Sequence, residues 1–194
     1  MNKKLLIAII IILVVILFLI FNPFKKKNNT GNTEFQVSSL TDLFPSKTTT
    51  YKYEENGQKY DVKVTDVSKA DDSTVVTTER KVKNDGNETT IRMKYEITSE
   101  KVVESGEYLE SGSVVSIIYP TEIIVGGIAV GSEWKSVDGL ITNKITKVEN
   151  NQVTIESTRK VDSYNEQTKT SEKKDYTEVR VFEKNKGLVS FSTK

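Results

Sequence analysis

The chain contains no histidine and no cysteine, the side chains on which much enzyme chemistry near neutral pH depends. Without imidazole or thiol there is no ordinary general base, no cysteine nucleophile and none of the common ligand sets for zinc, haem or iron–sulfur clusters. Carboxylate, hydroxyl and lysine chemistry remain. We therefore predict no catalytic residue, no metal site and no cofactor, and a protein that is not an enzyme.

Three short motifs resemble known functional sites in sequence but lack the structural context or the partner residues that those sites require. Ser132-Glu133-Trp134-Lys135 has the Ser-x-x-Lys spacing of serine acyl-enzymes, which requires a helix, whereas a strand is predicted here. Gly126–Gly131 is glycine-rich but lacks the Lys-Ser/Thr of a phosphate-binding loop. Asp71-Asp72 lacks the spaced oxygen ligands of a calcium loop. We interpret all three as structural.

Aromatic side chains are the remaining candidates for a binding site. We single out Tyr53, Tyr95, Trp134 and Tyr176, which all lie in predicted strands. If the sheet curls, such side chains can line a groove for an acyl chain, a peptide or a glycan; if it packs on itself, they are core. Trp134 is the only tryptophan and is expected to pack centrally.

The elements that would carry these residues are almost all strands. Apolar and polar residues alternate through Tyr60–Thr65 and again through Ile91–Ile97, which is typical of strands with one buried face. Turn residues separate the runs at Asn56-Gly57, Ser111-Gly112 and Asn150-Asn151. We expect a mainly β fold of about ten or eleven strands in a large curved antiparallel sheet, either a half-barrel or a sandwich.

Two parts of the chain repeat one order of features. An aromatic residue, a hairpin, a long strand and an arginine follow one another in residues 44–118 and again in 119–194. Arg80 in the first part corresponds to Arg159 in the second. Two unrelated β-meanders can also align in this way. The pattern therefore has two explanations, duplication of one meander or a chance similarity between two.

The N-terminus predicts a membrane anchor. Residues 1–4 form a short basic tail, and residues 5–21 are an unbroken apolar run. As a helix this run would span about 25 Å, close to a hydrocarbon core. No small-x-small cleavage site follows it, so we expect an uncleaved single-pass helix; if it is cleaved, the protein is secreted. Residues 22–34 read as a flexible linker to a domain at 35–194, which we place outside the cytoplasm.

The charge of this domain argues against nucleic acid as a partner. Residues 1–34 hold five Lys and one Glu, which leaves 23 basic and 26 acidic side chains and a net charge of −3 for the rest. A nucleic-acid-binding domain would need a basic surface. The predicted contacts are instead with the membrane through residues 5–21 and with an envelope protein or a lipid.

The second half resembles exported and lipoprotein-type β domains of low-GC Gram-positive bacteria that have no assigned function. The resemblance lies in a proline, a Val-Gly-x-x-Trp run, β-meanders and a closing Gly-x-Val hairpin. The corresponding residues are Pro120, Val130-Gly131-Ser132-Glu133-Trp134, Ile141–Val148, Gln152–Arg159 and Gly187-Leu188-Val189. More remotely, an export-anchored curved sheet is similar to the LolA/LppX-like carriers, which implies a concave face that holds acyl chains.

Three hypotheses about function follow. The first is a membrane-anchored, non-enzymatic binding or scaffolding domain outside the cytoplasm, which uses a sheet edge or a concave face. The second is a carrier of lipid or another hydrophobic ligand, with a sizeable apolar cavity. The third is a carboxylate-based glycan-acting enzyme, which would need two Asp or Glu residues facing each other in a cleft.

Overall fold

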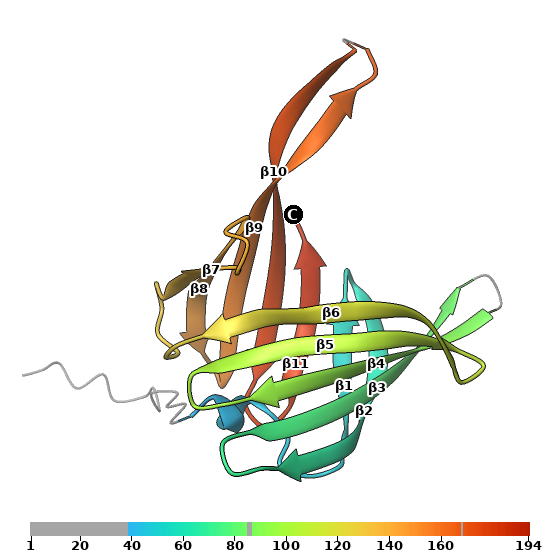
Figure 1. The fold of residues 1–194 in the computed structure, drawn as a ribbon, viewed down its shortest axis with the longest axis vertical. Helices are drawn as coiled ribbons and strands as arrows, with labels where there is room; N and C mark the ends of the chain where they lie inside the picture. The colour runs from blue at the N-terminus through green and yellow to red at the C-terminus, as the bar shows by residue number, and fades with distance from the viewer. Residues whose placement is uncertain (1–38, 85–86, 168) are drawn as a thin grey trace, which may run out of the picture. The chain divides into compact units, whose positions relative to one another are not determined.

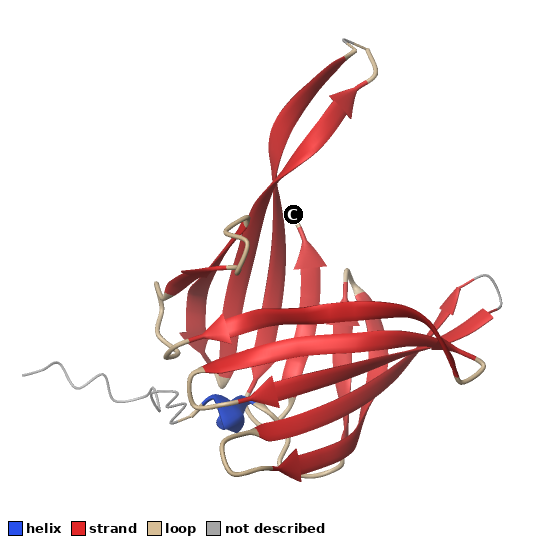
Figure 2. Cartoon of the chain, viewed as in Figure 1, coloured by secondary structure: helices blue, strands red, loops and turns tan. Residues whose placement is uncertain are grey.

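The computed structural model describes residues 39–84, 87–167 and 169–194. The predicted tail, anchor and linker, residues 1–34, lie outside this part of the chain. Within it, no helix is long and apolar enough to cross a membrane. The described residues form one short 3₁₀ helix and eleven strands, which confirms the predicted mainly β class (Figure 2).

The helix η1 (Leu40–Leu43) precedes all the strands. The strands are β1 (Thr50–Glu55), β2 (Gln58–Lys69), β3 (Thr74–Asn84), β4 (Asn87–Ile97), β5 (Lys101–Glu110), β6 (Ser113–Val125), β7 (Glu133–Lys135), β8 (Ile141–Glu149), β9 (Gln152–Asn165), β10 (Thr170–Glu183) and β11 (Gly187–Thr193).

All eleven strands belong to one sheet, in the order β6-β5-β4-β3-β2-β1-β11-β10-β9-β8-β7. Each half is a meander of consecutive antiparallel strands, β1–β6 and β7–β11. The two meanders meet at β1 and β11, which pair in parallel, with Glu54 opposite Ser190 and Glu55 opposite Phe191. The sequence predicts an antiparallel sheet, and this one parallel pair is the difference. The predicted boundary between repeats, 118/119, falls within β6, and the duplication stays a prediction.

The sheet curls until its two ends approach each other, so that it is barrel-like without a ladder between β6 and β7 (Figure 1). One cavity is lined by both Ile118 of β6 and Arg180 of β10. A second recess is lined by both Ile123 of β6 and Ser157 of β9. The inner faces of β6 and of β9–β10 therefore face each other across the interior.

A single hydrophobic core joins the two meanders. Its fully buried side chains are Leu43, Val64, Val76, Ile97, Val102, Ile124, Ile145, Val153, Ile155 and Phe182. The alternation predicted from the sequence is confirmed in β2 and β4, where Val62, Val64, Ile91, Tyr95 and Ile97 are buried. The charged residues between them, Lys63, Arg92, Lys94 and Glu96, lie on the outer face, as the pleat of a strand requires, whereas Met93 faces the interior.

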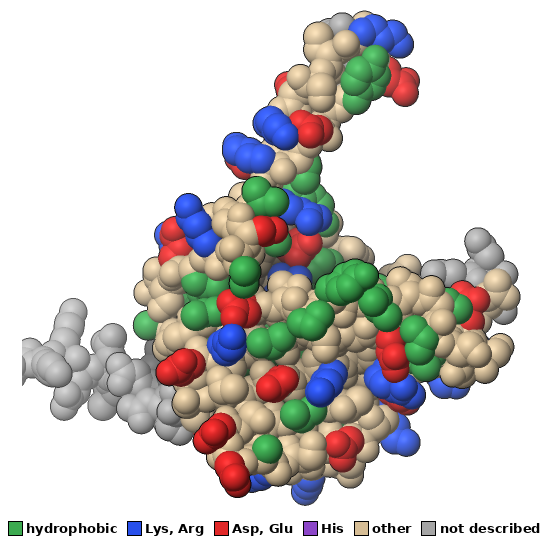
Figure 3. Space-filling model, viewed as in Figure 1, with side chains coloured by type: hydrophobic (Ala, Val, Ile, Leu, Met, Phe, Trp, Pro, Cys, Tyr) green, Lys and Arg blue, Asp and Glu red, His purple; other side chains and the backbone are tan. Residues whose placement is uncertain are grey.

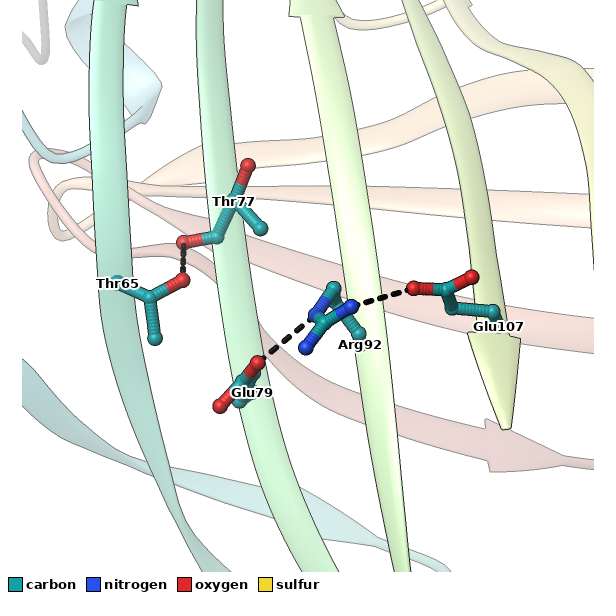
Figure 4. Close-up of polar contacts among 5 residues, drawn as sticks. All are labelled: Thr65, Thr77, Glu79, Arg92 and Glu107. Atoms are coloured by element: carbon teal, nitrogen blue, oxygen red, sulfur yellow. Dashed lines mark hydrogen bonds and ion pairs between the residues drawn. The ribbon is translucent and has the colours of Figure 1, made fainter. Parts of the chain in front are cut away.

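The outer face carries the polar residues of the same strands. Arg92 lies between two carboxylates on neighbouring strands: its Nε is 2.8 Å from Glu79 Oε1 and its Nη1 is 2.6 Å from Glu107 Oε1 (Figure 4). Nearby, the Thr65 hydroxyl donates to the carbonyl oxygen of Thr77 at 3.3 Å. These cross-strand contacts are partly exposed, so each adds at most about 1 kcal/mol.

Part of the β9–β10 hairpin projects beyond the rest of the sheet (Figure 1). Residues 160–175 pair only with each other, because the partners in β8 and β11 end before them. Ion pairs between Lys160 and Asp175 and between Lys173 and Asp162, both at 2.8 Å, cross this ribbon. An isolated two-stranded hairpin is only marginally stable, so the ribbon is the part of β9–β10 with least support.

The predicted two-residue turns are confirmed. Asn56 and Gly57 both have positive φ, 46° and 84°, as a type I′ hairpin turn requires. Ser111-Gly112 and Asn150-Asn151 also have positive φ at both positions. These turns fix the register of three hairpins.

Replacing Gly57 with valine should lower the free energy of unfolding by about 1–2 kcal/mol, since a branched side chain is strained at positive φ. No heavy atom lies within 4 Å of the added Cβ position, so the cost would come from the backbone alone. Gly127→Val is the matched control, because Gly127 has equal space and no positive φ. Urea unfolding of both variants measures the difference; equal stabilities would show that the turn tolerates valine.

Candidate functional site

The interior of the curled sheet contains a cavity of about 130 Å³ on its concave face. Long strands of both meanders supply its walls, since alternate residues of each strand point inward. Its lining residues are Tyr51, Tyr53, Glu55, Val62, Thr78, Arg80, Ile91, Met93, Tyr95, Glu104, Tyr108, Ile118, Arg180, Leu188 and Phe191. The cavity has room for several water molecules or for one small polar group.

Arg80 of β3 forms one side of this site. Its guanidinium carbon lies 4.5 Å from the ring centre of Tyr53 and 5.4 Å from that of Tyr60, as in cation–π contacts. Its Nη1 atom is 2.8 Å from Glu55 Oε2, which makes an ion pair. The Nη1 atom is buried as well. Burial acts to lower the pKa of Arg80, but Tyr53 and the hydrogen-bonded Glu55 raise it, so the guanidinium group stays charged.

Arg180 of β10 is held in a similar way. Its Nη2 atom is 2.9 Å from Glu178 Oε2, and its guanidinium carbon lies 5.5 Å from the ring centre of Phe191. Its Nη1 donates to Ser157 Oγ at 3.2 Å, and the Ser157 hydroxyl donates to Asn143 Oδ1 at 2.7 Å. Each arginine thus contacts a carboxylate and at least one aromatic ring, and both line the same cavity.

Glu104 of β5 is the buried acidic residue of the site. Burial raises the pKa of its carboxyl above the ordinary value, because a charged carboxylate loses its hydration there. Arg180 and the Tyr95 hydroxyl act in the opposite direction, Glu178 raises the pKa further, and Arg80 lowers it. The net direction is upward, which favours the neutral form of Glu104 compared with an exposed glutamate.

The tyrosine hydroxyl groups of the cavity stay protonated. Burial raises the pKa of Tyr51, with a further contribution from Tyr53. Burial also raises the pKa of Tyr53 and of Tyr95, and the charge of Glu104 adds to the effect on Tyr95. These residues therefore present hydroxyl groups that can donate hydrogen bonds.

The four aromatic residues predicted from the sequence do not come together. Tyr53 and Tyr95 both line the cavity. Trp134 is buried in the core, where its Nε1 has no hydrogen-bond partner among the described residues. Tyr176 lies in a separate recess of about 40 Å³, with the Arg159 guanidinium carbon 5.0 Å from its ring centre.

The charged residues of the cavity were not predicted from the sequence, although a signal for them exists. In β3 the inward positions run from Val76 through Thr78 to Arg80, and in β5 they include Val102 and Glu104. A charged residue at an inward position breaks the apolar alternation. Such a break marks a buried charge, which needs a partner or a ligand.

The motifs discounted in the sequence do not form a site either. The Ser132 hydroxyl donates to the carbonyl oxygen of Gly127 at 3.3 Å, and Lys135 is exposed. Asp71 and Asp72 lie exposed between β2 and β3. Among the described residues, no group of three acidic side chains is placed to hold a metal ion.

Comparison of the whole chain with models of protein families, with curated proteins and with solved structures gives no significant match in any of the three.

Proposed function

We propose that this protein is a non-enzymatic binding domain that holds a small anionic group, a carboxylate or a phosphate, in its interior cavity. The observation that carries the proposal is that Arg80 and Arg180, two largely buried guanidinium groups from different meanders, line one cavity. Arginine has five N–H donors and suits planar or tetrahedral oxyanions. An anion in the cavity would accept hydrogen bonds from both groups.

An anion would meet less repulsion in this cavity than its number of carboxyl groups suggests. Glu55 and Glu178 each lie beside one guanidinium group, 2.8 Å from Arg80 Nη1 and 2.9 Å from Arg180 Nη2. The raised pKa of Glu104 favours its neutral form, so the third carboxyl opposes an incoming anion less than a normal glutamate would. Tyrosine hydroxyl groups on the same wall can donate to the ligand as well.

The size of the cavity favours this ligand over the alternatives. Sites for drug-sized or acyl ligands usually have a volume of about 300–1,000 Å³, well above the 130 Å³ here. A glycan hydrolase needs space for a sugar ring between two carboxyl groups. Glu55 and Glu104 both line the cavity, but Glu55 is engaged by Arg80, so we rank a hydrolase below a binding domain.

The cellular setting of the proposal rests on the sequence. An apolar run at residues 5–21 would anchor the protein to the membrane, and the domain would face the outside of the cell. The bound anion would then belong to a component of the cell envelope, either a free small molecule or the charged end of a larger one.

Calorimetric titration of the full chain in mild detergent tests the proposal, with acetate and inorganic phosphate as probes and chloride at equal ionic strength as the blank. We expect Arg80→Gln to weaken binding of at least one probe by about tenfold or more, since it removes a charge-assisted contact. Arg92→Gln is the control, because Arg92 lies on the outer face. Circular dichroism shows whether each variant is folded. If Arg80→Gln does not fold, Arg180→Lys takes its place as the cavity variant.

The pH dependence of binding separates the cavity from nonspecific ion effects. As the pH rises through the raised pKa of Glu104, its carboxyl gains a negative charge and anion affinity should fall. Glu104→Gln should remove this dependence. Two results would overturn the proposal. One is that neither acetate nor phosphate binds, and the other is that Arg80→Gln and Arg92→Gln bind them equally well.

A further inference from the structure

We infer that two copies of this chain associate through the free edge of β6, which pairs antiparallel with β6 of the second copy about a two-fold axis at Ser116. This inference concerns an edge of the sheet and does not depend on the cavity. Three observations carry it: the length of the edge, its lack of charge, and the symmetry of its sequence.

The two edges of the sheet differ greatly in length. β6 has 13 residues and, within the part of the chain that the structure describes, pairs only with β5, whereas β7 at the other edge has three residues. An edge strand presents unpaired N–H and C=O groups to any strand that can lie beside it. Natural proteins commonly protect an edge by making it short or charged, and β7 (Glu133-Trp134-Lys135) is both.

The β6 edge is long and uncharged over most of its length, and its protection is confined to a bulge at Val115 and to Pro120. Residues 111–121 contain no charged side chain, although 28% of the whole chain is charged. The side chains of Val114, Val115, Ile117 and Tyr119 are 51%, 53%, 53% and 74% exposed. Figure 3 shows apolar side chains gathered on the surface along β6. Such an edge is expected to have a partner.

The sequence of β6 indicates that this partner is a second copy. Val114-Val115-Ser116-Ile117-Ile118 reads as valine, valine, serine, isoleucine, isoleucine, and is symmetric in side-chain type about its centre. A two-fold axis at Ser116 therefore places Val114 opposite Ile118 and Val115 opposite Ile117. Facing β-branched side chains stabilise an antiparallel pair by about 0.2–1 kcal/mol each.

Two local features limit this pairing. A bulge beside the axis bends β6, since Tyr108 is opposite Ser116 while Leu109 is opposite Val114. Pairing with the other copy would therefore be closest at Val115–Ile117, on either side of the axis. The ladder would end at Pro120, which has no N–H to donate. No like charges are brought opposite each other, so the surface is complementary to itself, as a two-fold interface requires.

Cysteine cross-linking tests the register, because the chain has no cysteine of its own. Under mild oxidation of the full chain in detergent, Ser116→Cys should form a covalent dimer, since the two positions would lie about 5 Å apart. Ser113→Cys is the matched control on the same strand. Its two copies would be six residues apart along the ladder, about 20 Å, and should remain unlinked.

Sedimentation equilibrium tests the association itself. We expect the unmodified full chain to form dimers, and Ser116→Lys to weaken dimer formation by about tenfold or more by placing two ammonium groups face to face. Val137→Lys is the control, because Val137 is 92% exposed and lies outside β6.

Two results would overturn the inference. One is a Ser116→Cys variant that stays unlinked, as it would if another segment or another protein covers β6. The other is a variant that behaves like its control. This would be the case if Ser113→Cys and Ser116→Cys formed covalent dimers to the same extent, or if Ser116→Lys and Val137→Lys weakened the dimer to the same extent.

Discussion

Replacing Phe182 with alanine should lower the free energy of unfolding by about 3–5 kcal/mol, the largest class of loss for a core side chain. Phe182 is fully buried in β10 and lies opposite Val153 of β9 and Leu188 of β11. Its ring centre is 6.0 Å from that of Phe44, which follows η1. Removal of the Phe182 ring would leave a cavity between Phe44 and the second meander.

Val181→Ala is the matched control for this measurement. Val181 is the neighbour of Phe182 in the same strand and is only half-buried. The loss of two methyl groups from a half-buried position should cost about 1 kcal/mol or less. Urea unfolding followed by circular dichroism compares the two variants. Equal losses would mean that Phe182 does not hold the core together as its burial implies.

Replacing Trp134 with alanine should cost about 3–5 kcal/mol of unfolding free energy for the same reason. Trp134 is 9% exposed, within the common core cluster, although it lies in the three-residue edge strand β7. Among the described strands β7 pairs only with β8, and the indole ring adds a contact with the core to this short ladder.

Trp134→Phe separates the ring from its polar atom. The indole Nε1 is buried without a partner among the described residues, and an unsatisfied buried donor is costly. Phenylalanine retains most of the ring contacts and removes that donor, so we expect a loss below about 1.5 kcal/mol. Circular dichroism is needed as the probe, because both changes remove the only tryptophan. A Trp134→Ala loss below about 1 kcal/mol would place the ring outside the core.

The strands could be predicted because their signals are local. Each alternating run, such as Ile91–Ile97, carries its own pattern of buried and exposed positions. Each tight turn, such as Asn56-Gly57, carries residues that tolerate positive φ. These signals act between residues that are close in sequence, so one sequence was sufficient for the β class, the number of strands and several hairpins.

The candidate site was only half predictable. Tyr53 and Tyr95 were named from their type and share a cavity, whereas Trp134 and Tyr176 lie elsewhere. The positions of four aromatic residues within strands do not show which of their side chains will line the same cavity. That depends on how far the sheet curls, which is set by side chains from many strands at once.

Composition and local patterning were enough to predict a mainly β domain with hairpin turns, to exclude histidine and cysteine chemistry, and to identify an apolar run at residues 5–21. The arrangement of the strands in space does not follow from these local signals. The parallel pairing of β1 with β11 joins segments more than a hundred residues apart, and it brings Arg80 of the first meander and Arg180 of the second to one cavity. Alternation states which face of a strand is buried, but not which other strand it will meet. The cavity and its charges therefore follow from the closure of the sheet.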